Sequence, residues 1–581
     1  MRLTSTLHLS TTFKRFPLAL ISAFLTTSIL IFLIEGKGPE YNHFSTFLKI
    51  ALTSSLGFFL FIALRLMREK NPLCLAGILS LVGYFFILPD MIHPPFIMIE
   101  RHLFLALGLF IMILWSPYYK STADNEAFWE WMQRVIFGFV TAIFFALIIY
   151  AGIAAAFAAF HILFSIKIAG ERYLELFVGV MGYFSTSYFL SQIPDISKPL
   201  TPRAYSKTKT ILTKYILTPL IIVYFFILYT YTFKILFSGQ YPEGKLAWII
   251  IFFSIISVIT YLFWTPFFKQ LAFKERRFLS LALFLQTLML FLSLSMRVDA
   301  YGWTHNRALV GLLGLWLFGI SLYFLLNKKA RYKWVFISLS LLIMIGQIGP
   351  FSVYEIGKKS QQHRLQSLLK KAKANPSRKH LDISLRYAIS DTIHYLHKNH
   401  GITSLQPLMP AIINKYKAKG NDDFFPSFAT KELGFTYINY WEYKHDTNAS
   451  LPFGLYRYDG NLPLHIAGYD WKIEAFYDGL DRPMSSMLPQ SETRFILTAK
   501  TLKISEHNQT IATIPLEKFI HTIINDPSLN QYQDYDMQDD ARLSHSYHDS
   551  HIKVKLFMME LNTDSNKSIN MMHIKVLYKR L

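Results

Sequence analysis

The first 350 residues consist of apolar runs long enough to cross a lipid bilayer, separated by short polar segments. A helix needs about 20 consecutive apolar residues to span the hydrocarbon core, and its backbone groups must pair within the helix there. Eleven runs meet or approach this length, at 16–34, 48–66, 72–88, 102–117, 135–160, 174–190, 213–235, 246–264, 278–296, 308–326 and 334–350. The sequence therefore predicts a membrane all-α domain of about 11 transmembrane helices over residues 1–350.

Two details of this assignment have alternatives. The runs 72–88 and 102–117 are short and have prolines between them, so a re-entrant pair is the alternative to two full spans. The first run follows Arg2, Lys14 and Arg15, as the core of a signal peptide would. Because it is 19 residues long and no Ala-x-Ala site follows, we expect an uncleaved first span.

The distribution of cations predicts the orientation. Residues 1–350 hold 30 Lys and Arg against 14 Asp and Glu, and residues 351–581 hold 29 against 24. With the N-terminus inside, cytoplasmic segments collect 21 of the first 30 cations and the opposite side collects 9. By the positive-inside rule, the N-terminus is expected to be cytoplasmic and residues 351–581 extracytoplasmic. Since the cations gather between apolar runs, the membrane explains the net charge of +21, and we expect no nucleic-acid partner.

Residues 351–581 predict a soluble α+β C-terminal domain. Helices are expected at 360–374 and 380–400, the second with an apolar stripe of Leu385, Ile389, Ile393 and Leu396. Alternating apolar residues predict strands around 469–475, 502–504, 552–558 and 574–576, and Pro515 is expected to open a short helix. The only cysteine, Cys74, lies in an apolar run, which excludes an internal disulfide.

Polar residues line two faces of the predicted bundle. Gln286 and Ser293 are seven residues apart, and so are Tyr224 and Tyr231, so each pair shares a helix face. Hydrogen bonding between helices is the preferred interpretation, and a substrate path is the alternative. No Asp, Glu, Lys or Arg lies near the middle of an apolar run, which argues against a proton- or ion-coupled pump.

The segment between the ninth and tenth runs combines cations, a carboxylate and aromatic residues around a glycine. Its candidate residues are Arg297, Asp299, Tyr301, Trp303, Thr304 and Arg307. Two arginines in such a loop are able to pair with an anionic head group. The preferred alternative is a structural interfacial turn, with Asp299 paired to an arginine and the aromatic rings at the membrane surface.

The sequence predicts no catalytic residue, metal site or cofactor. Two histidine groups occur, His394, His397 and His400 in one and His545, His548 and His551 in the other. Imidazoles suit zinc or copper, but the second group crosses a loop, where spacing by three does not align side chains. The nucleophile-elbow, phosphate-loop and zinc-protease motifs are absent.

Several stretches resemble the bacterial membrane family called domain of unknown function 4153. They are Tyr188–Pro194, Leu212–Tyr231, Tyr241–Gly244, Tyr301–Thr304 with Arg307, and Gly349–Pro350 leading into Gln362–Leu365. The resemblance implies a multi-pass protein of the bacterial inner membrane, and it offers no catalytic residues to transfer.

Three functions remain open from the sequence. The first is an envelope sensing or scaffolding protein without enzymatic activity, to which the lack of a catalytic constellation points. The second is a transporter or flippase of a lipid-like substrate, and the third is a membrane enzyme acting on an envelope lipid or glycan at the outer face. The expected partners are membrane lipids and an envelope protein.

Overall fold

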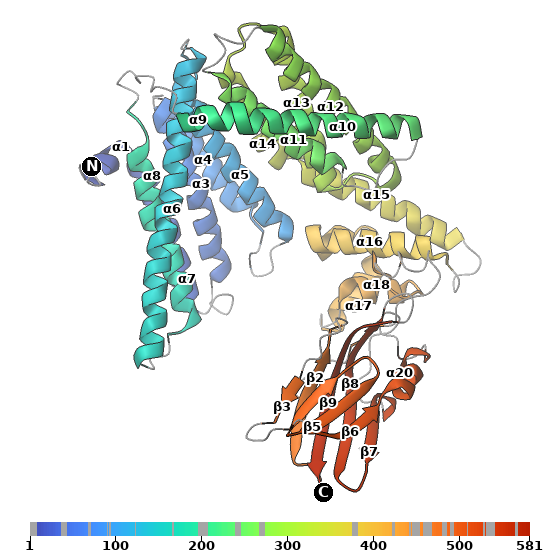
Figure 1. Cartoon of the computed structure of the whole chain (residues 1–581). Helices are drawn as coiled ribbons and strands as arrows, with labels where there is room; N and C mark the ends of the chain where they lie inside the picture. Colours follow the sequence, from blue (N-terminus) through green and yellow to red (C-terminus); the bar gives the residue numbers. More distant parts are fainter. Residues whose placement is uncertain are drawn as a thin grey trace. The chain divides into compact units, whose positions relative to one another are not determined.

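The computed structural model is mostly helical, with a small sheet domain at the C-terminal end (Figure 1). It describes residues 9–36, 43–67, 71–89, 91, 95–121, 124–164, 168–195, 207–238, 246–265, 273–374, 381–420, 424–440, 443, 454–456, 468–478, 485–488, 493–507, 509–526, 529, 541–563 and 568–581. The stretch Tyr241–Gly244, used above for the family resemblance, lies outside these residues.

Seven helices of the described residues are long and apolar enough to cross a membrane. They are α2 (Pro17–Glu35), α3 (Phe44–Met67), α5 (Phe96–Trp115) with η2 (Ser116–Tyr118), α6 (Asn125–Phe164), α9 (Lys207–Ile211) with η4 (Leu212–Leu217) and α10 (Thr218–Ser238), α12 (Phe273–Tyr301) and α13 (His305–Leu326). Shorter apolar helices are α4 (Asn71–Ile87), α11 (Leu246–Phe263) and α14 (Tyr332–Gln347). These helices establish a membrane protein. The seven long apolar helices are fewer than the eleven spans predicted from the sequence.

The remaining helices of this region are short or interrupted. α1 (Leu9–Arg15) precedes the first long helix, and α7 (Gly170–Gly179), η3 (Val180–Ser185) and α8 (Thr186–Gln192) follow one another without a break. Both η3 and η4 are π-helical. Just after η4, Pro219 has no N–H to continue the α-helical ladder, and both the backbone N–H and the hydroxyl of Thr218 bond to the Thr213 carbonyl. The wider turn therefore accommodates the proline.

Close helix pairs are made possible by small residues. α5 lies along α14, and a Cβ on Gly108 would lie 3.5 Å from the Ser340 carbonyl oxygen. The indole N–H of Trp115 donates to the Ser340 hydroxyl over 2.8 Å. Small side chains at such contacts let helix backbones approach, and a polar pair between helices removes an unpaired group from the apolar interior.

The chain continues after α14 with helices of polar composition. They are α15 (Val353–Ala374), α16 (Ile383–His400), η7 (Ile402–Leu405), α17 (Pro410–Ala418) and α18 (Phe425–Glu432). α15 begins seven residues before the predicted helix at 360–374, and the Ser352 hydroxyl accepts from the Glu355 N–H at its start. In α16, Ile389, Ile393 and Leu396 of the predicted apolar stripe are buried, and Leu385 is half-buried.

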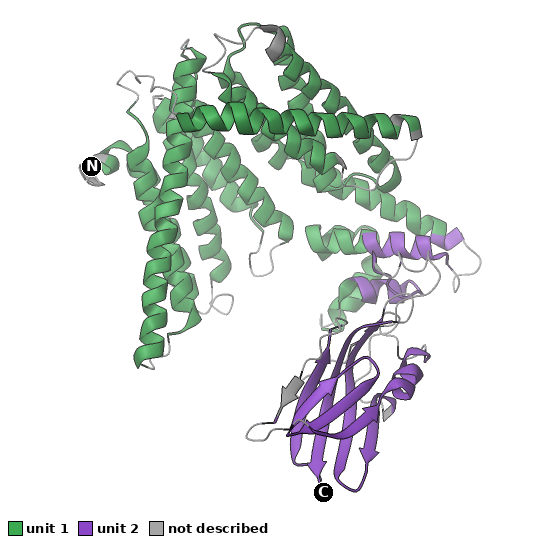
Figure 2. Cartoon of the chain, viewed as in Figure 1, with its two compact units in different colours: residues 1–371, 392–425 green, residues 372–391, 426–581 purple. Residues whose placement is uncertain are grey.

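The chain forms two compact units (Figure 2). The first comprises residues 1–371 and 392–425, and the second comprises residues 372–391 and 426–581. α16 contributes residues to both units.

The second unit contains two antiparallel sheets. One has the order β1 (Gly454–Tyr456), β8 (Ile552–Thr563), β9 (Ile569–Arg580), β2 (Trp471–Tyr477), with β7 (Ser544–His548) also paired to β8. The other has the order β3 (Ser485–Met487), β4 (Arg494–Leu497), β5 (Thr501–Glu506), β6 (Gln509–Pro515); α20 (Glu517–Ile524) and η9 (Ala541–Leu543) complete the unit.

The two sheets share one apolar core. Alternate residues of β8, including Val554, Leu556 and Met558, are fully buried, and the ring of Phe495 on β4 meets that of Tyr578 on β9 at 5.3 Å. Because side chains alternate across a strand, burying one face leaves the other face of β8 and β9 outside this core.

Candidate functional site

The predicted loop residues lie at a tight turn between α12 and α13. Arg297, Asp299 and Tyr301 belong to the end of α12, and Arg307 belongs to the first turn of α13. Between them, Gly302 has a φ of 71°, in the left-handed region that favours glycine. The Thr304 hydroxyl caps α13 by accepting from the Arg307 N–H at 3.4 Å.

The backbone of this turn is satisfied from α15. The Gln361 amide nitrogen donates to the carbonyls of Tyr301 and Trp303 over 2.8 and 2.9 Å, and the Ser360 hydroxyl accepts from the Trp303 N–H. The Arg307 guanidinium donates to the Gly302 carbonyl over 2.6 Å and lies over the Tyr301 ring. These bonds join the stretch Tyr301–Thr304 to residues directly before Gln362–Leu365, and both stretches carry the family resemblance.

His305, the first residue of α13, is the centre of a larger group of polar side chains. The Tyr395 hydroxyl on α16 lies 2.9 Å from the His305 backbone nitrogen and 2.9 Å from its Nδ1. The His305 side chain is buried and stacks between the rings of Tyr354 and Tyr395. We call Glu100, Arg101, His305, Tyr354, Tyr395 and His400 the polar cluster.

Glu100 faces the other nitrogen of the same imidazole. Its Oε2 lies 3.4 Å from His305 Nε2, without the alignment of a hydrogen bond, and has no hydrogen-bond partner among the described residues. The Tyr395 oxygen already accepts the His305 backbone N–H, so its own proton is available for Nδ1. This arrangement assigns the imidazole proton to Nε2, toward the carboxylate.

α15 passes so close to the turn that one position has to be glycine. A Cβ on Gly357 would lie 2.7 Å from the His305 backbone nitrogen and 3.0 Å from the Tyr395 hydroxyl. Contacts below 3.0 Å to backbone atoms require the helix to shift. Gly357 therefore sets the distance between α15 and the start of α13.

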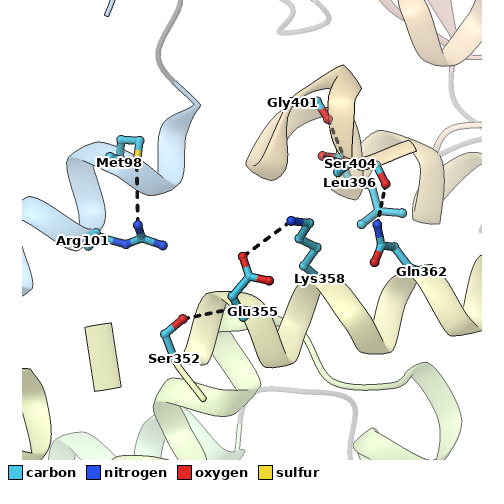
Figure 3. A network of polar contacts seen from close by, with 9 residues as sticks. All are labelled: Met98, Arg101, Ser352, Glu355, Lys358, Gln362, Leu396, Gly401 and Ser404. Atoms are coloured by element: carbon cyan, nitrogen blue, oxygen red, sulfur yellow. Dashed lines mark hydrogen bonds and ion pairs between the residues drawn. The ribbon is translucent and has the colours of Figure 1, made fainter. Parts of the chain in front are cut away.

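Two cations place positive charge near His400, namely Arg101 within the polar cluster and Lys358 on α15. The Arg101 guanidinium lies 4.8 Å from the centre of the Tyr354 ring. Figure 3 shows Arg101 on α5 and, on α15, Lys358 beside Glu355, 3.5 Å apart. In the same view the Gln362 amide donates to the Ser404 carbonyl over 2.6 Å, which fixes η7 to α15.

Burial keeps His400, Tyr395 and Tyr354 in their neutral forms. Loss of hydration lowers the pKa of His400 to about 3, and the nearby charges of Lys358 and Arg101 act in the same direction. Loss of hydration raises the pKa of Tyr395 to about 12 and also raises the pKa of Tyr354. An added proton on His400 would therefore be a poorly hydrated charge among cations.

Four atoms of the polar cluster have no hydrogen-bond partner among the described residues. They are Glu100 Oε2, Arg101 Nε, the Tyr354 hydroxyl and His400 Nε2. Buried polar groups of this kind are commonly satisfied by ordered water. The polar cluster thus connects α5, α13, α15 and α16 through protein contacts. It also retains donor and acceptor atoms that can bond to water.

The other predicted residues lie elsewhere. Asp299 is exposed and forms no ion pair within the described part of the chain. Tyr224 packs on Phe253 of α11, with 4.8 Å between ring centres. Gln286 is 1% exposed and its amide has no described partner, whereas Ser293 and Tyr231 are half-buried.

Several contributing residues give little signal in the sequence, among them Tyr229, Glu100 and Tyr395. Tyr229, rather than its neighbours Tyr224 and Tyr231, donates to the Ala282 carbonyl on α12 over 2.7 Å. Glu100 was missed because the apolar run was taken to begin at residue 102, whereas α5 begins at 96. Tyr395 gives no local signal, since its partner is ninety residues away.

The histidines of the two groups lie mostly against aromatic rings. His397 stacks on Phe425 and His545 on Phe519, with ring centres 5.2 and 5.3 Å apart. Within the described residues, His, Cys, Asp and Glu side chains do not form a group of three suited to a metal ion.

The long apolar helices, their short turns and the small sheet domain define a multi-pass membrane protein. Residues 16–392 match the family described as a domain of unknown function, DUF4153, and the chain belongs to that family. An uncharacterized protein of Pasteurella multocida strain Pm70 is 22% identical over 372 residues, which is 62% of this chain and 60% of that protein. The match thus spans less than two thirds of this relative. No solved structure matches.

Replacing Gly357 with alanine tests the close approach of α15. Helix propensity alone predicts a gain of about 1 kcal/mol for Gly→Ala, whereas the contact with the His305 backbone predicts a loss of about 1–3 kcal/mol. We expect a lower melting temperature in detergent. Gly319→Ala on α13 is the control, since a Cβ there meets nothing within 4 Å. A Gly357→Ala protein as stable as Gly319→Ala would contradict the packing.

Acid should destabilise the fold through His400. An unfolded histidine has a pKa of about 6.5, and the folded pKa is about 3. Between these values the unfolded state binds more protons, so stability is complete above about pH 6.5 and falls as the pH drops toward 3. His400→Asn should flatten the dependence of melting temperature on pH in this range. Equal slopes for the variant and the wild type would show that His400 is already hydrated.

Proposed function

We propose that this chain is an envelope sensing or scaffolding protein of the bacterial inner membrane that performs no chemistry itself. Its helical domain crosses the membrane eleven times, with the N-terminus cytoplasmic and residues 351–581 extracytoplasmic. The seven long helices, the three shorter apolar helices and the interrupted helix from α7 to α8 supply enough segments for eleven spans. The 21-to-9 distribution of cations supports the orientation.

The observation that carries this proposal is the pair of hydrogen bonds between His305 and Tyr395. Tyr395 lies nearly fifty residues after the end of α14, yet it bonds to the first residue of a membrane helix. A partner that moves α16 therefore acts on α13 through a direct contact. Such a partner shifts the protein between states only by its different affinities for them, and the contact supplies a physical route for this coupling.

The turn between α12 and α13 supports a structural role over anion binding. Arg307 donates to the Gly302 carbonyl within the turn, and Gln361 occupies the two neighbouring carbonyls. An arginine used in this way has fewer donors for a head group. The turn is thus proposed to transmit position between α13 and α15.

The enzyme alternative has a specific difficulty. Glu100, His305 and Tyr395 are groups suited to proton transfer. However, His305 is 5% exposed, and each of its ring nitrogens faces a protein group. A general base has to reach the proton of a substrate, so this arrangement favours support of the fold.

The transporter alternative rests on Gln286. Its amide is buried in α12 without a described partner. A buried amide can line a path for a polar head group or bond to a water held between helices. We keep it as the second candidate function.

Tyr395→Phe tests the scaffold proposal, because it removes the hydroxyl and keeps the ring. Amide exchange should quicken in residues 301–307 and 353–365 and remain unchanged in α2 and α3. Native mass spectrometry should find a protein partner at a fixed ratio with the wild type and lose it with the variant. Tyr215→Phe, at an exposed tyrosine of η4, is the control. A lipid inside the bundle and no protein partner would favour the transporter.

A reporter fused after Leu581 tests the topology. An odd number of spans with the N-terminus inside places the C-terminus outside the cytoplasm. A fluorescent protein that matures only in the cytoplasm should stay dark, and an alkaline phosphatase fusion should be active. A bright fluorescent fusion would contradict the orientation and the number of spans together.

A further inference from the structure

One face of the sheet formed by β1, β8, β9, β2 and β7 carries five lysines outside the shared core. The strand register places Lys553 directly opposite Lys579, and it places Lys472 and Lys555 on the two sides of Leu577. Lys575 lies one step further along β9, opposite Glu474. Lys575 is buried, at 2% exposed, and is not available to a ligand. We call Lys472, Lys553, Lys555 and Lys579 the lysine face.

The position of these lysines is costly for the isolated domain. Like charges directly opposite each other destabilise an antiparallel pair, as at Lys553 and Lys579. Lysines on edge strands prevent strands of other molecules from pairing, but β9 lies between β8 and β2, and β8 pairs with β9, β1 and β7. Edge protection therefore explains only Lys472. The cluster on the two central strands needs another cause.

Acidic groups on the same face lie to one side. Glu474 lies on β2, 3.4 Å from His573 and 3.9 Å from Lys575, and Asp470 directly precedes that strand. His548 on β7 is opposite Lys553, and Glu560 on β8 is opposite His573. Within the described strand pairs, Lys553 and Lys555 thus have no carboxylate directly opposite them.

Aromatic rings are the contacts recorded for two central lysines. The ammonium of Lys553 lies 5.0 Å from the centre of the Tyr469 ring, and that of Lys555 lies 5.1 Å from the Phe557 ring. In the described part of the chain Lys472, Lys553, Lys555 and Lys579 form no ion pair. Their charges remain open to an outside anion.

From this arrangement we infer that the lysine face binds an acidic lipid surface, through the phosphate groups of anionic phospholipids. A flat array of lysines suits many separate phosphates, because each ammonium acts as a point charge on a flexible stem. Phe476, on the same face and 43% exposed, adds an aromatic side chain of the kind that enters membrane interfaces.

The chain's own membrane helices favour lipid over an acidic protein as the partner. A domain covalently joined to a spanning bundle meets the bilayer at high effective concentration, so weak contacts to single phosphates suffice. A soluble acidic protein has no such advantage. This inference does not depend on the scaffold proposal, since it concerns only the second unit and lipid.

The test places the full chain in nanodiscs of phosphatidylcholine alone or of phosphatidylcholine mixed with phosphatidylglycerol. An amine-reactive reagent labels exposed lysines, and mass spectrometry reads each site. Labelling of Lys472, Lys553 and Lys555 should fall several-fold in acidic nanodiscs and recover at high salt. Labelling of Lys503 and Lys518, exposed elsewhere in the second unit, should not change.

A matched pair of variants completes the experiment. In Lys553→Gln/Lys555→Gln, protection of Lys472 should weaken by about fivefold for each lysine removed, as expected for about 1 kcal/mol per cation at an acidic surface. Lys503→Gln/Lys518→Gln should behave like the wild type. The first variant should melt no lower than the wild type, because the Lys553–Lys579 repulsion is gone. Labelling independent of lipid charge would overturn the inference, as would protection insensitive to salt.

Discussion

Three consecutive backbone carbonyls at the α12–α13 turn, those of Tyr301, Gly302 and Trp303, need hydrogen-bond donors, and the chain supplies them from Gln361 and Arg307. Unpaired backbone groups are costly wherever water is excluded. The Gln361 bonds require α15 to lie against the turn, which in turn requires glycine at 357. These contacts hold α15, a helix of polar composition, against the start of the membrane helix α13.

The polar cluster attached to this turn is better suited to specifying one arrangement than to adding stability. Burying Glu100 and Arg101 near the start of α5 costs hydration that their contacts only partly replace, since one atom of each lacks a described partner. A misplaced α16 would leave the His305 backbone N–H and imidazole unpaired as well. The cost of wrong packing is therefore larger than the gain from correct packing. The polar cluster therefore favours one arrangement of the four helices. Protonation of His400 would weaken that arrangement.

Local sequence patterns predicted the long apolar helices and the strands with alternating residues. A helix in lipid needs a long apolar run, and a strand with one buried face needs an apolar residue at every second position. The stripe on α16 and the buried residues of β8 follow directly from those patterns. The polar cluster could not be predicted in this way. Its members lie on four helices far apart in sequence, and His305 and Tyr395 each look like ordinary polar positions. The sequence held one partial signal for this site. Thr304 is a typical N-cap residue, and the helix that it caps begins with His305.

The polar cluster buries polar and charged groups, whereas the lysine face keeps cations outside the apolar core of its unit. The polar cluster belongs to the first unit and the lysine face to the second, and α16 has residues in both units. Residues 383–391 of this helix belong to the second unit, and residues 392–400, with Tyr395 and His400, belong to the first. Anything that holds the second unit, such as acidic lipid on its lysines, therefore acts on a helix that also bonds to His305.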